Sequence, residues 1–201
     1  MEISIELVKD LRQRTGAGVI DCKAALQEAQ GNMEAAIDYL RRKGLATAAK
    51  KAGRIATDGL VASYIHAGGK MGVLVEINCE TDFVAKTEDF QTFVKNIAMH
   101  IAAANPQYIR REEIPEEVLE RERAIYRTQA QDSGKPQKVI DKIVEGKMER
   151  FFSEVCLLEQ TYVRDSDLTI KELLDAMIAK VGENVTIRRF ARFQLGEGLS
   201  S

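Results

Sequence analysis

One short segment of the chain combines a thiol, two carboxylates and an aromatic ring: Cys79-Glu80-Thr81-Asp82-Phe83-Val84. The segment lies between a predicted strand and a predicted helix, which indicates a loop. In one interpretation Asp82 caps the turn that follows and Phe83 folds back into the core. In the other, the loop presents Phe83 outward as an anchor for a partner, because aromatic residues carry a disproportionate share of interface energy.

The remaining residues that could catalyse a reaction or bind a metal lack the required spacing. His66 and His100 have no cysteine or second histidine nearby in the sequence, so no zinc site is predicted. We expect His100 at the surface or flank of a helix, because it shares that helix with Ile97 and Ile101. A thiol enzyme that uses Cys79 stays open, because the partners of a catalytic cysteine meet in space rather than in sequence.

Two glycine-containing segments resemble parts of phosphate-binding loops. Gly16-Ala17-Gly18 follows a predicted helix instead of a strand and lacks the later glycine of a dinucleotide fingerprint. We interpret it as a tight turn between helices. Gly68-Gly69-Lys70 also lacks the spacing and the helix that a phosphate loop needs. The sequence therefore predicts no nucleotide site and no cofactor.

The composition narrows the class of protein further. A chain of 201 residues that is 45% hydrophobic can bury the core of one or two domains. Its 29 basic and 31 acidic residues give a net charge of -2, which argues against direct nucleic-acid binding. No apolar run approaches the roughly 20 residues of a membrane span, and the first residues lack the apolar core of a signal peptide. Three cysteines without CxxC spacing indicate free thiols and a cytoplasmic protein: Cys22, Cys79 and Cys156.

Three short helices are predicted at the beginning of the chain. Ser4 caps the first helix, and Gly31 provides a left-handed stop after the second. We expect Gly44 to end the third helix and residues 45–58 to form a helical linker. This part, residues 1–55, is predicted to be a three-helix domain with its linker.

The pattern changes to alternation after this linker. The runs 60–65 and 73–77 flank Gly68-Gly69, which is typical of a β-hairpin. A helix from Thr87 then follows, and Asn105-Pro106 is expected to stop it. Residues 56–201 are therefore predicted to form an α+β core with an antiparallel sheet.

Two further features complete the predicted core. Charged helices between residues 115 and 155 are expected to form an antiparallel hairpin with a turn at Gly134 and Pro136. A final helix is expected from Thr169 to Gly182, because Thr169 and Glu172 have the spacing of a capping box. A last strand is expected over residues 185–195.

Two long motifs resemble the signature sequences of the elongation factor Ts family. They are residues 11–26, LRQRTGAGVIDCKAAL, and residues 76–86, EINCETDFVAK. Their order and separation match as well. Further resemblance runs through residues 50–53 and 134–136 and from 182 to the end, so that it covers essentially the whole chain. The resemblance implies that the first 50-odd residues form a ubiquitin-associated-like three-helix domain and that the remainder is the family's core.

The resemblance also implies a function and a partner. The family's partner is elongation factor Tu, a GTPase that delivers aminoacyl-tRNA to the ribosome, and the family acts as its guanine-nucleotide exchange factor without covalent chemistry. The loop of Thr81, Asp82, Phe83 and Val84 would reach the partner's nucleotide pocket and displace its magnesium ion. The N-terminal signature would contact the partner's nucleotide-binding domain through Arg12, Gly16, Gly18, Val19, Ile20 and Lys23.

Length is the one departure from the family pattern. Longer relatives carry a duplicated core module, whereas this chain has a single copy, and the resemblance implies that short members compensate by pairing. We therefore expect a homodimer, with Cys156 or the final strand at its interface. The alternative function is a small ubiquitin-associated-like adaptor, or a ribosome-associated interaction module, that uses the N-terminal helices and leaves the Thr81–Val84 loop without a purpose.

Overall fold

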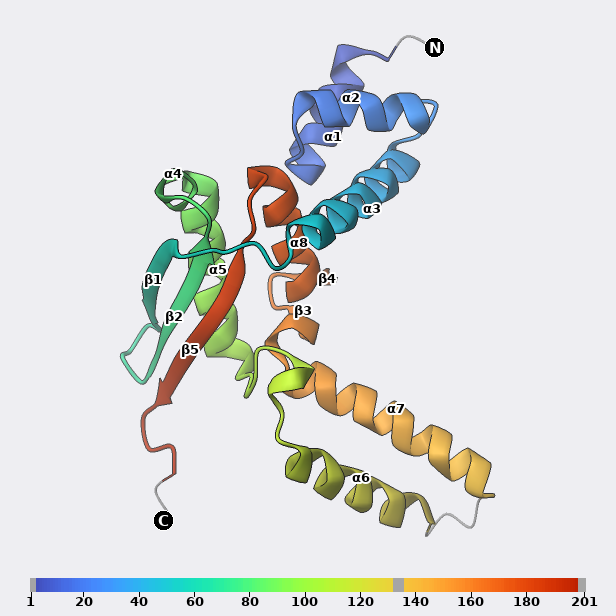
Figure 1. Cartoon of the computed structure of the whole chain (residues 1–201), viewed down its shortest axis with the longest axis vertical. Helices are drawn as coiled ribbons and strands as arrows, with labels where there is room; N and C mark the ends of the chain where they lie inside the picture. The colour runs from blue at the N-terminus through green and yellow to red at the C-terminus, as the bar shows by residue number, and fades with distance from the viewer. Residues whose placement is uncertain (1–2, 132–135, 199–201) are drawn as a thin grey trace. The chain divides into compact units, whose positions relative to one another are not determined.

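The computed structural model describes residues 3–131 and 136–198 and has an α+β fold (Figure 1). Its α-helices are α1 (Ile5–Thr15), α2 (Val19–Glu28), α3 (Met33–Lys51), α4 (Asp82–Ala85), α5 (Glu88–Ala104), α6 (Glu116–Gln131), α7 (Gln137–Val155) and α8 (Ile170–Val181). Its strands are β1 (Asp58–Ile65), β2 (Met71–Cys79), β3 (Thr161–Tyr162), β4 (Asp165–Thr169) and β5 (Thr186–Gln194), and short 3-10 turns occupy Arg111–Glu113 and Leu157–Glu159. The predicted α+β class is confirmed. Within these residues no helix is long and apolar enough to cross a membrane.

The strands form two sheets. The larger has the order β1-β2-β5, and the smaller pairs β3 with β4 in antiparallel register. The predicted hairpin is confirmed: β1 and β2 flank Gly68 and Gly69, whose φ angles are 92° and 69°. The hairpin is closed by the amide of His66, which donates to the carbonyl of Met71 at 2.9 Å. The β3–β4 pair was not predicted, because its short polar segments lack the alternation that indicates a strand.

The chain divides into two compact units. The first comprises Met1–Leu60, Ile77–Phe93 and Glu172–Thr186, and the second comprises Val61–Glu76, Val94–Lys171 and Ile187–Ser201. The boundary expected from the sequence, between residues 55 and 56, stays a prediction.

The N-terminal helices of the first unit follow their local sequence. The Ser4 hydroxyl accepts from the amide of Leu7 at 3.2 Å and caps α1, as predicted. Gly16, with a φ angle of 67°, ends α1 in the left-handed conformation. The three helices share one small core of fully buried side chains: Leu11, Cys22, Ala25, Leu26 and Ala36.

Gly44 does not end the third helix, so this expectation is wrong. Helix α3 continues through Gly44 to Lys51 and is followed by Gly53, whose φ angle is 85°. A Cβ atom at Gly44 would lie 3.6 Å from the Cβ of Ala179 in α8. Helices α3 and α8 thus pass close to each other at Gly44, and the alanine-rich sequence after it favours helix over a stop. The expected helical linker is helical only as far as Lys51.

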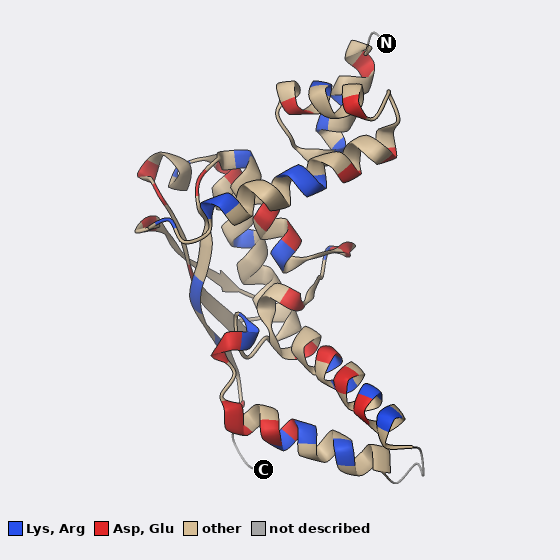
Figure 2. Cartoon of the chain, turned by 45° about the vertical axis from the view of Figure 1, so that its right-hand side comes forward, with Lys and Arg blue, Asp and Glu red and all other residues tan. Residues whose placement is uncertain are grey.

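The helical hairpin of the second unit is confirmed. Helices α6 and α7 lie side by side, with charged residues of both signs along them (Figure 2). The expected turn at Gly134 lies outside the described residues. At the base of the hairpin, Arg111 pairs with Glu149 at 2.6 Å and with Glu159 at 2.5 Å. Its guanidinium also stacks on the ring of Phe152, 4.1 Å from the centroid, so this one side chain links three segments.

His100 is fully buried in the second unit, so the expected surface position is wrong. Its Nε2 lies 2.9 Å from Oε1 of Gln160, and the amide of Val163 donates to its Nδ1 at 3.3 Å. Because Nδ1 must accept from that amide, the proton of the neutral ring lies on Nε2. The Gln160 side-chain amide in turn donates to the carbonyls of Ala104 and Glu154 at 3.3 and 2.7 Å. The polar atoms of both buried side chains are therefore satisfied.

Burial lowers the pKa of His100 below its usual value of 6.5, although the hydrogen bond to Gln160 opposes the shift. The unfolded chain then binds this proton more readily than the folded protein does. The contribution of His100 to the free energy of unfolding is therefore fully present above about pH 6.5. As the pH falls below that value, the free energy of unfolding decreases by no more than about 1.4 kcal/mol per pH unit. We expect urea unfolding to show a smaller free energy at pH 5.5 than at pH 7.5. His66→Gln should keep this dependence, and equal free energies at the two pH values would contradict it.

Candidate partner-binding site

The segment around Phe83 forms a short, outward-facing turn. Phe83 lies in the four-residue helix α4 and is 79% exposed, whereas Val84 and Ala85 beside it are buried. The cap of α4 is Thr81, whose hydroxyl accepts from the amide of Val84 at 3.5 Å. The interpretation in which Asp82 is the cap and Phe83 folds into the core is therefore wrong.

Asp82 is the first residue of α4 and points to solvent. Its carboxylate accepts a hydrogen bond from Nζ of Lys86, one helical turn later, at 2.5 Å. That bond lowers the pKa of Asp82 and raises the pKa of Lys86. Asp82 is thus ionised at neutral pH and paired with Lys86, in the residue that precedes the exposed Phe83.

The α4 turn is attached to the segment between α8 and β5. The carboxylate of Glu183 accepts from the amides of Glu80 and Thr81 at 3.1 and 3.0 Å, and from the Thr81 hydroxyl at 2.7 Å. The amide of Asn184 donates back to the carboxylate of Glu80 at 2.6 Å. These bonds join two segments that are more than 100 positions apart in the sequence.

The N-terminal candidate residues gather around the turn between α1 and α2. Val19 and Ile20, in the first turn of α2, are 54% and 84% exposed. Arg12 and Lys23 are exposed as well. Together these side chains offer apolar surface next to positive charge.

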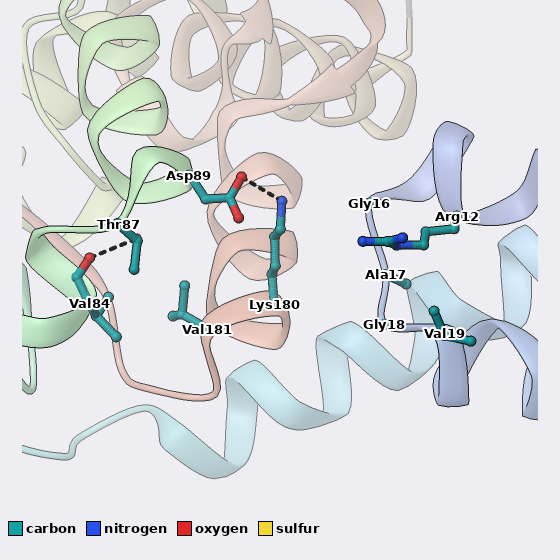
Figure 3. A pocket seen from close by; sticks show the side chains of 10 residues that line it. All are labelled: Arg12, Gly16, Ala17, Gly18, Val19, Val84, Thr87, Asp89, Lys180 and Val181. Carbon is teal, nitrogen blue, oxygen red and sulfur yellow. Dashed lines mark hydrogen bonds and ion pairs between the residues drawn. The ribbon is translucent and has the colours of Figure 1, made fainter. Parts of the chain in front are cut away.

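An open hollow of about 390 Å³ lies within the first unit (Figure 3). It brings four N-terminal candidates together with Val84 of the second motif; the four are Arg12, Gly16, Gly18 and Val19. Figure 3 also shows an ion pair beside it, in which Lys180 lies 2.7 Å from Asp89. Ile20, Lys23, Asp82 and Phe83 are not among the residues that line this hollow.

Cys79 does not have the environment of a catalytic thiol. It is fully buried, and its Sγ donates to the carbonyl of Thr81 at 3.1 Å. Burial, and after it the charge of Glu183, raises its pKa to about 11, so the thiol is protonated at neutral pH. The part of the chain that the structure describes also contains no group of three or more His, Cys, Asp or Glu that could hold a metal ion.

Comparison with known proteins places this chain in a family. The family model described as "Elongation factor TS" matches residues 45–197. The Elongation factor Ts of Carboxydothermus hydrogenoformans is 63% identical over 198 residues, which cover 98% of this chain and 91% of that protein. The Elongation factor Ts of Thermoanaerobacter pseudethanolicus is 63% identical over 199 residues, which cover 99% and 98% of the two chains. The chain belongs to the elongation factor Ts family and is thus a translation elongation factor.

Reasoning from the sequence overlooked Glu183 at this site. Gly182 was expected to end the last helix, and residues 182–184 otherwise contributed only to the family resemblance. No pattern near Glu183 indicates a contact with Thr81. A single carboxylate after a helix is normally interpreted as exposed, so only the arrangement in space reveals its three hydrogen bonds.

Proposed function

We propose that this protein is a guanine-nucleotide exchange factor for elongation factor Tu and that the α4 turn is its working element. The observation that carries the proposal is the 79% exposure of Phe83 on a short turn that is held in place by hydrogen bonds. A large exposed ring adds little to the stability of its own chain, whereas it is well suited to enter an apolar pocket of a partner.

The proposed mechanism is displacement of the magnesium ion from the partner. Magnesium neutralises the phosphates of bound GDP, so its loss weakens nucleotide binding. Phe83 would act as a wedge between side chains of the partner, and the charge of Asp82 would perturb the polar groups that hold the ion. Thr81 and Val84 would flank this wedge, Thr81 as the cap of α4 and Val84 as its buried base.

The N-terminal helices supply the second proposed contact. We assign them to a ubiquitin-associated-like domain within residues 1–55, followed by the core of residues 56–201. The exposed Val19 and Ile20 and the cationic Arg12 and Lys23 would lie against the nucleotide-binding domain of the partner, with Gly16 and Gly18 shaping the turn. These contacts would give affinity, while the α4 turn would act on the nucleotide.

Nucleotide exchange is a matter of linked binding equilibria. A factor that lowers the affinity of its partner for GDP must itself bind less tightly, to the same degree, when nucleotide is present. Incoming GTP therefore releases the factor. This cycle requires no nucleophile, general acid or general base in the factor, which agrees with the buried and protonated state of Cys79.

A homodimer is part of the proposal. Cys156 is fully buried within its own chain, so the expectation that it lies at the interface is wrong. The final strand β5 instead exposes Phe193 to 67%, and the β1–β2 hairpin exposes Val61 and Ile65 to 70% and 65%. Covering this apolar surface with a second copy would be favourable. A monomer in light scattering at micromolar concentration would count against the dimer.

The decisive experiment is release of labelled GDP from purified elongation factor Tu. We expect the intact chain at micromolar concentration to accelerate release well above the spontaneous rate. An unchanged rate would refute the exchange proposal. Binding to elongation factor Tu or to ribosomes without faster release would favour the adaptor alternative.

A further inference from the structure

We propose that Glu183 is a positioning residue for nucleotide exchange, which holds the α4 turn so that Asp82 and Phe83 project in the orientation the partner requires. The inference rests on the proposed function and assigns a residue outside both sequence motifs. Glu183 belongs to the segment between α8 and β5 and would not itself touch the nucleotide pocket.

Glu183 holds the start of the α4 turn through three hydrogen bonds. One carboxylate oxygen accepts hydrogen bonds from the two backbone amides that precede α4, those of Glu80 and Thr81, at 3.1 and 3.0 Å. The other oxygen accepts from the Thr81 hydroxyl at 2.7 Å. Hydrogen bonds to a charged acceptor are stronger than neutral ones. Glu183 therefore fixes both the backbone and the side chain of Thr81.

Thr81 in turn caps α4, the helix that carries the exposed Phe83. The Thr81 hydroxyl donates its proton to Glu183, which leaves its oxygen lone pairs free to accept from the amide of Val84. That bond caps α4, a helix of only four residues. So short a helix is not stable alone, because the cost of its first turn exceeds the gain from its few internal bonds. The direction of Phe83 thus depends on the cap, and the cap depends on Glu183.

The connection between the two segments is reciprocal. The carboxylate of Glu80 accepts from the amide of Asn184 at 2.6 Å and lies 3.2 Å from Nη1 of Arg54. The side-chain amide of Asn184 donates to the carbonyl of Arg54 at 2.6 Å. The segment before α4 and the segment between α8 and β5 therefore each supply one carboxylate that accepts a hydrogen bond from a backbone amide of the other segment. A turn held from both sides is rigid before the partner arrives, and less conformational entropy is lost on binding.

The experiment compares three variants by the efficiency of GDP release from elongation factor Tu. Glu183→Ala removes all three hydrogen bonds and should lower the efficiency about tenfold, a loss equivalent to one charge-assisted hydrogen bond. Glu183→Gln keeps an acceptor for the backbone amides and should stay within about threefold of wild type. Glu117→Ala removes an exposed carboxylate on α6 and should match wild type. Wild-type efficiency in Glu183→Ala would overturn the inference.

Two further measurements separate positioning from general stability. In the background of the partly active Phe83→Leu, Glu183→Ala should cost clearly less than in wild type, because both changes affect the same contact. A fully additive loss would overturn the inference. Hydrogen exchange on the free protein should show lost protection at the amides of Thr81 and Val84 in Glu183→Ala. Unchanged protection at these amides would refute the inference about Glu183, whatever the result of the release assay. Failure of the wild type to release GDP would refute only the proposed function.

Discussion

Replacing Phe83 with alanine is expected to slow GDP release from elongation factor Tu by roughly 30- to 1,000-fold, the range that corresponds to the loss of an interface hot spot. The ring is 79% exposed in the free protein, so its removal deletes little packing within the chain. The loss should therefore fall on exchange, whereas the thermal unfolding midpoint should stay within about 2 °C of wild type. Stopped-flow release of labelled GDP and circular dichroism measure the two quantities.

A graded series makes this prediction sharper. Phe83→Leu keeps part of the apolar volume and should lose about tenfold, between the wild type and the alanine variant. Val163→Ala shortens another exposed apolar side chain, on the turn between β3 and β4, and should have no effect on release. If Phe83→Ala releases GDP as fast as wild type while remaining folded, Phe83 is not the wedge.

The exposure of Phe83 shows where reasoning from sequence alone stops. The segment suggested both an inward and an outward ring, and nothing local decides between them. The outward direction of Phe83 depends on Glu183, whose hydrogen bonds to Thr81 connect residues 102 positions apart. Composition and periodicity report the immediate neighbourhood of a residue, so a carboxylate that arrives from a distant segment leaves no trace in them.

Elements that depend on local chemistry were predicted well. The Ser4 cap, the left-handed Gly31 with a φ angle of 83° and the Gly68-Gly69 turn each follow from the conformational preference of one or two residues. Such features need no knowledge of the rest of the chain. They explain why the helices and the main hairpin of this protein appear where the sequence places them.

Gly44 and His100 were misplaced for the opposite reason. A glycine permits either a helix end or close packing, and the approach of Ala179 from α8 favours packing. A histidine on a helix can be buried when partners satisfy both ring nitrogens, and Gln160 and the amide of Val163 do so. In both cases a tertiary contact overrides the preference of the residue itself.

The second large effect is expected from Gly59→Ala, which should lower the free energy of unfolding by roughly 4 kcal/mol or more. Gly59 has a φ angle of 137°, a conformation that residues with a side chain rarely adopt. A Cβ atom there would lie 2.2 Å from the carbonyl oxygen of Ile77 and 2.7 Å from the Cα of Asn78. Both are backbone atoms of β2, so no side chain can rotate away to make room.

The clash would reach the strand that leads into the α4 turn. To relieve it, β1 would have to move away from β2, and the bond from the Asn78 side-chain amide to the carbonyl of Asp58, 3.1 Å long, would be lost. Because Asn78 is buried, the loss of this bond adds a further cost. The same movement would shift the backbone at Cys79, immediately before the residues that Glu183 holds.

Gly53→Ala is the matched control for this prediction. Gly53 also has a positive φ angle, 85°, but a Cβ atom there would have no neighbour within 4 Å. Gly53→Ala should lower the free energy of unfolding only by the cost of a side chain in the left-handed conformation, about 1–2 kcal/mol. Urea unfolding of both variants gives the difference, which isolates the overlap with β2 from the strain of the glycine conformation. Equal losses of unfolding free energy in the two variants would mean that β1 moves away from β2 at little cost. The α4 turn would then be held by its bonds to the segment of Glu183, without support from β2.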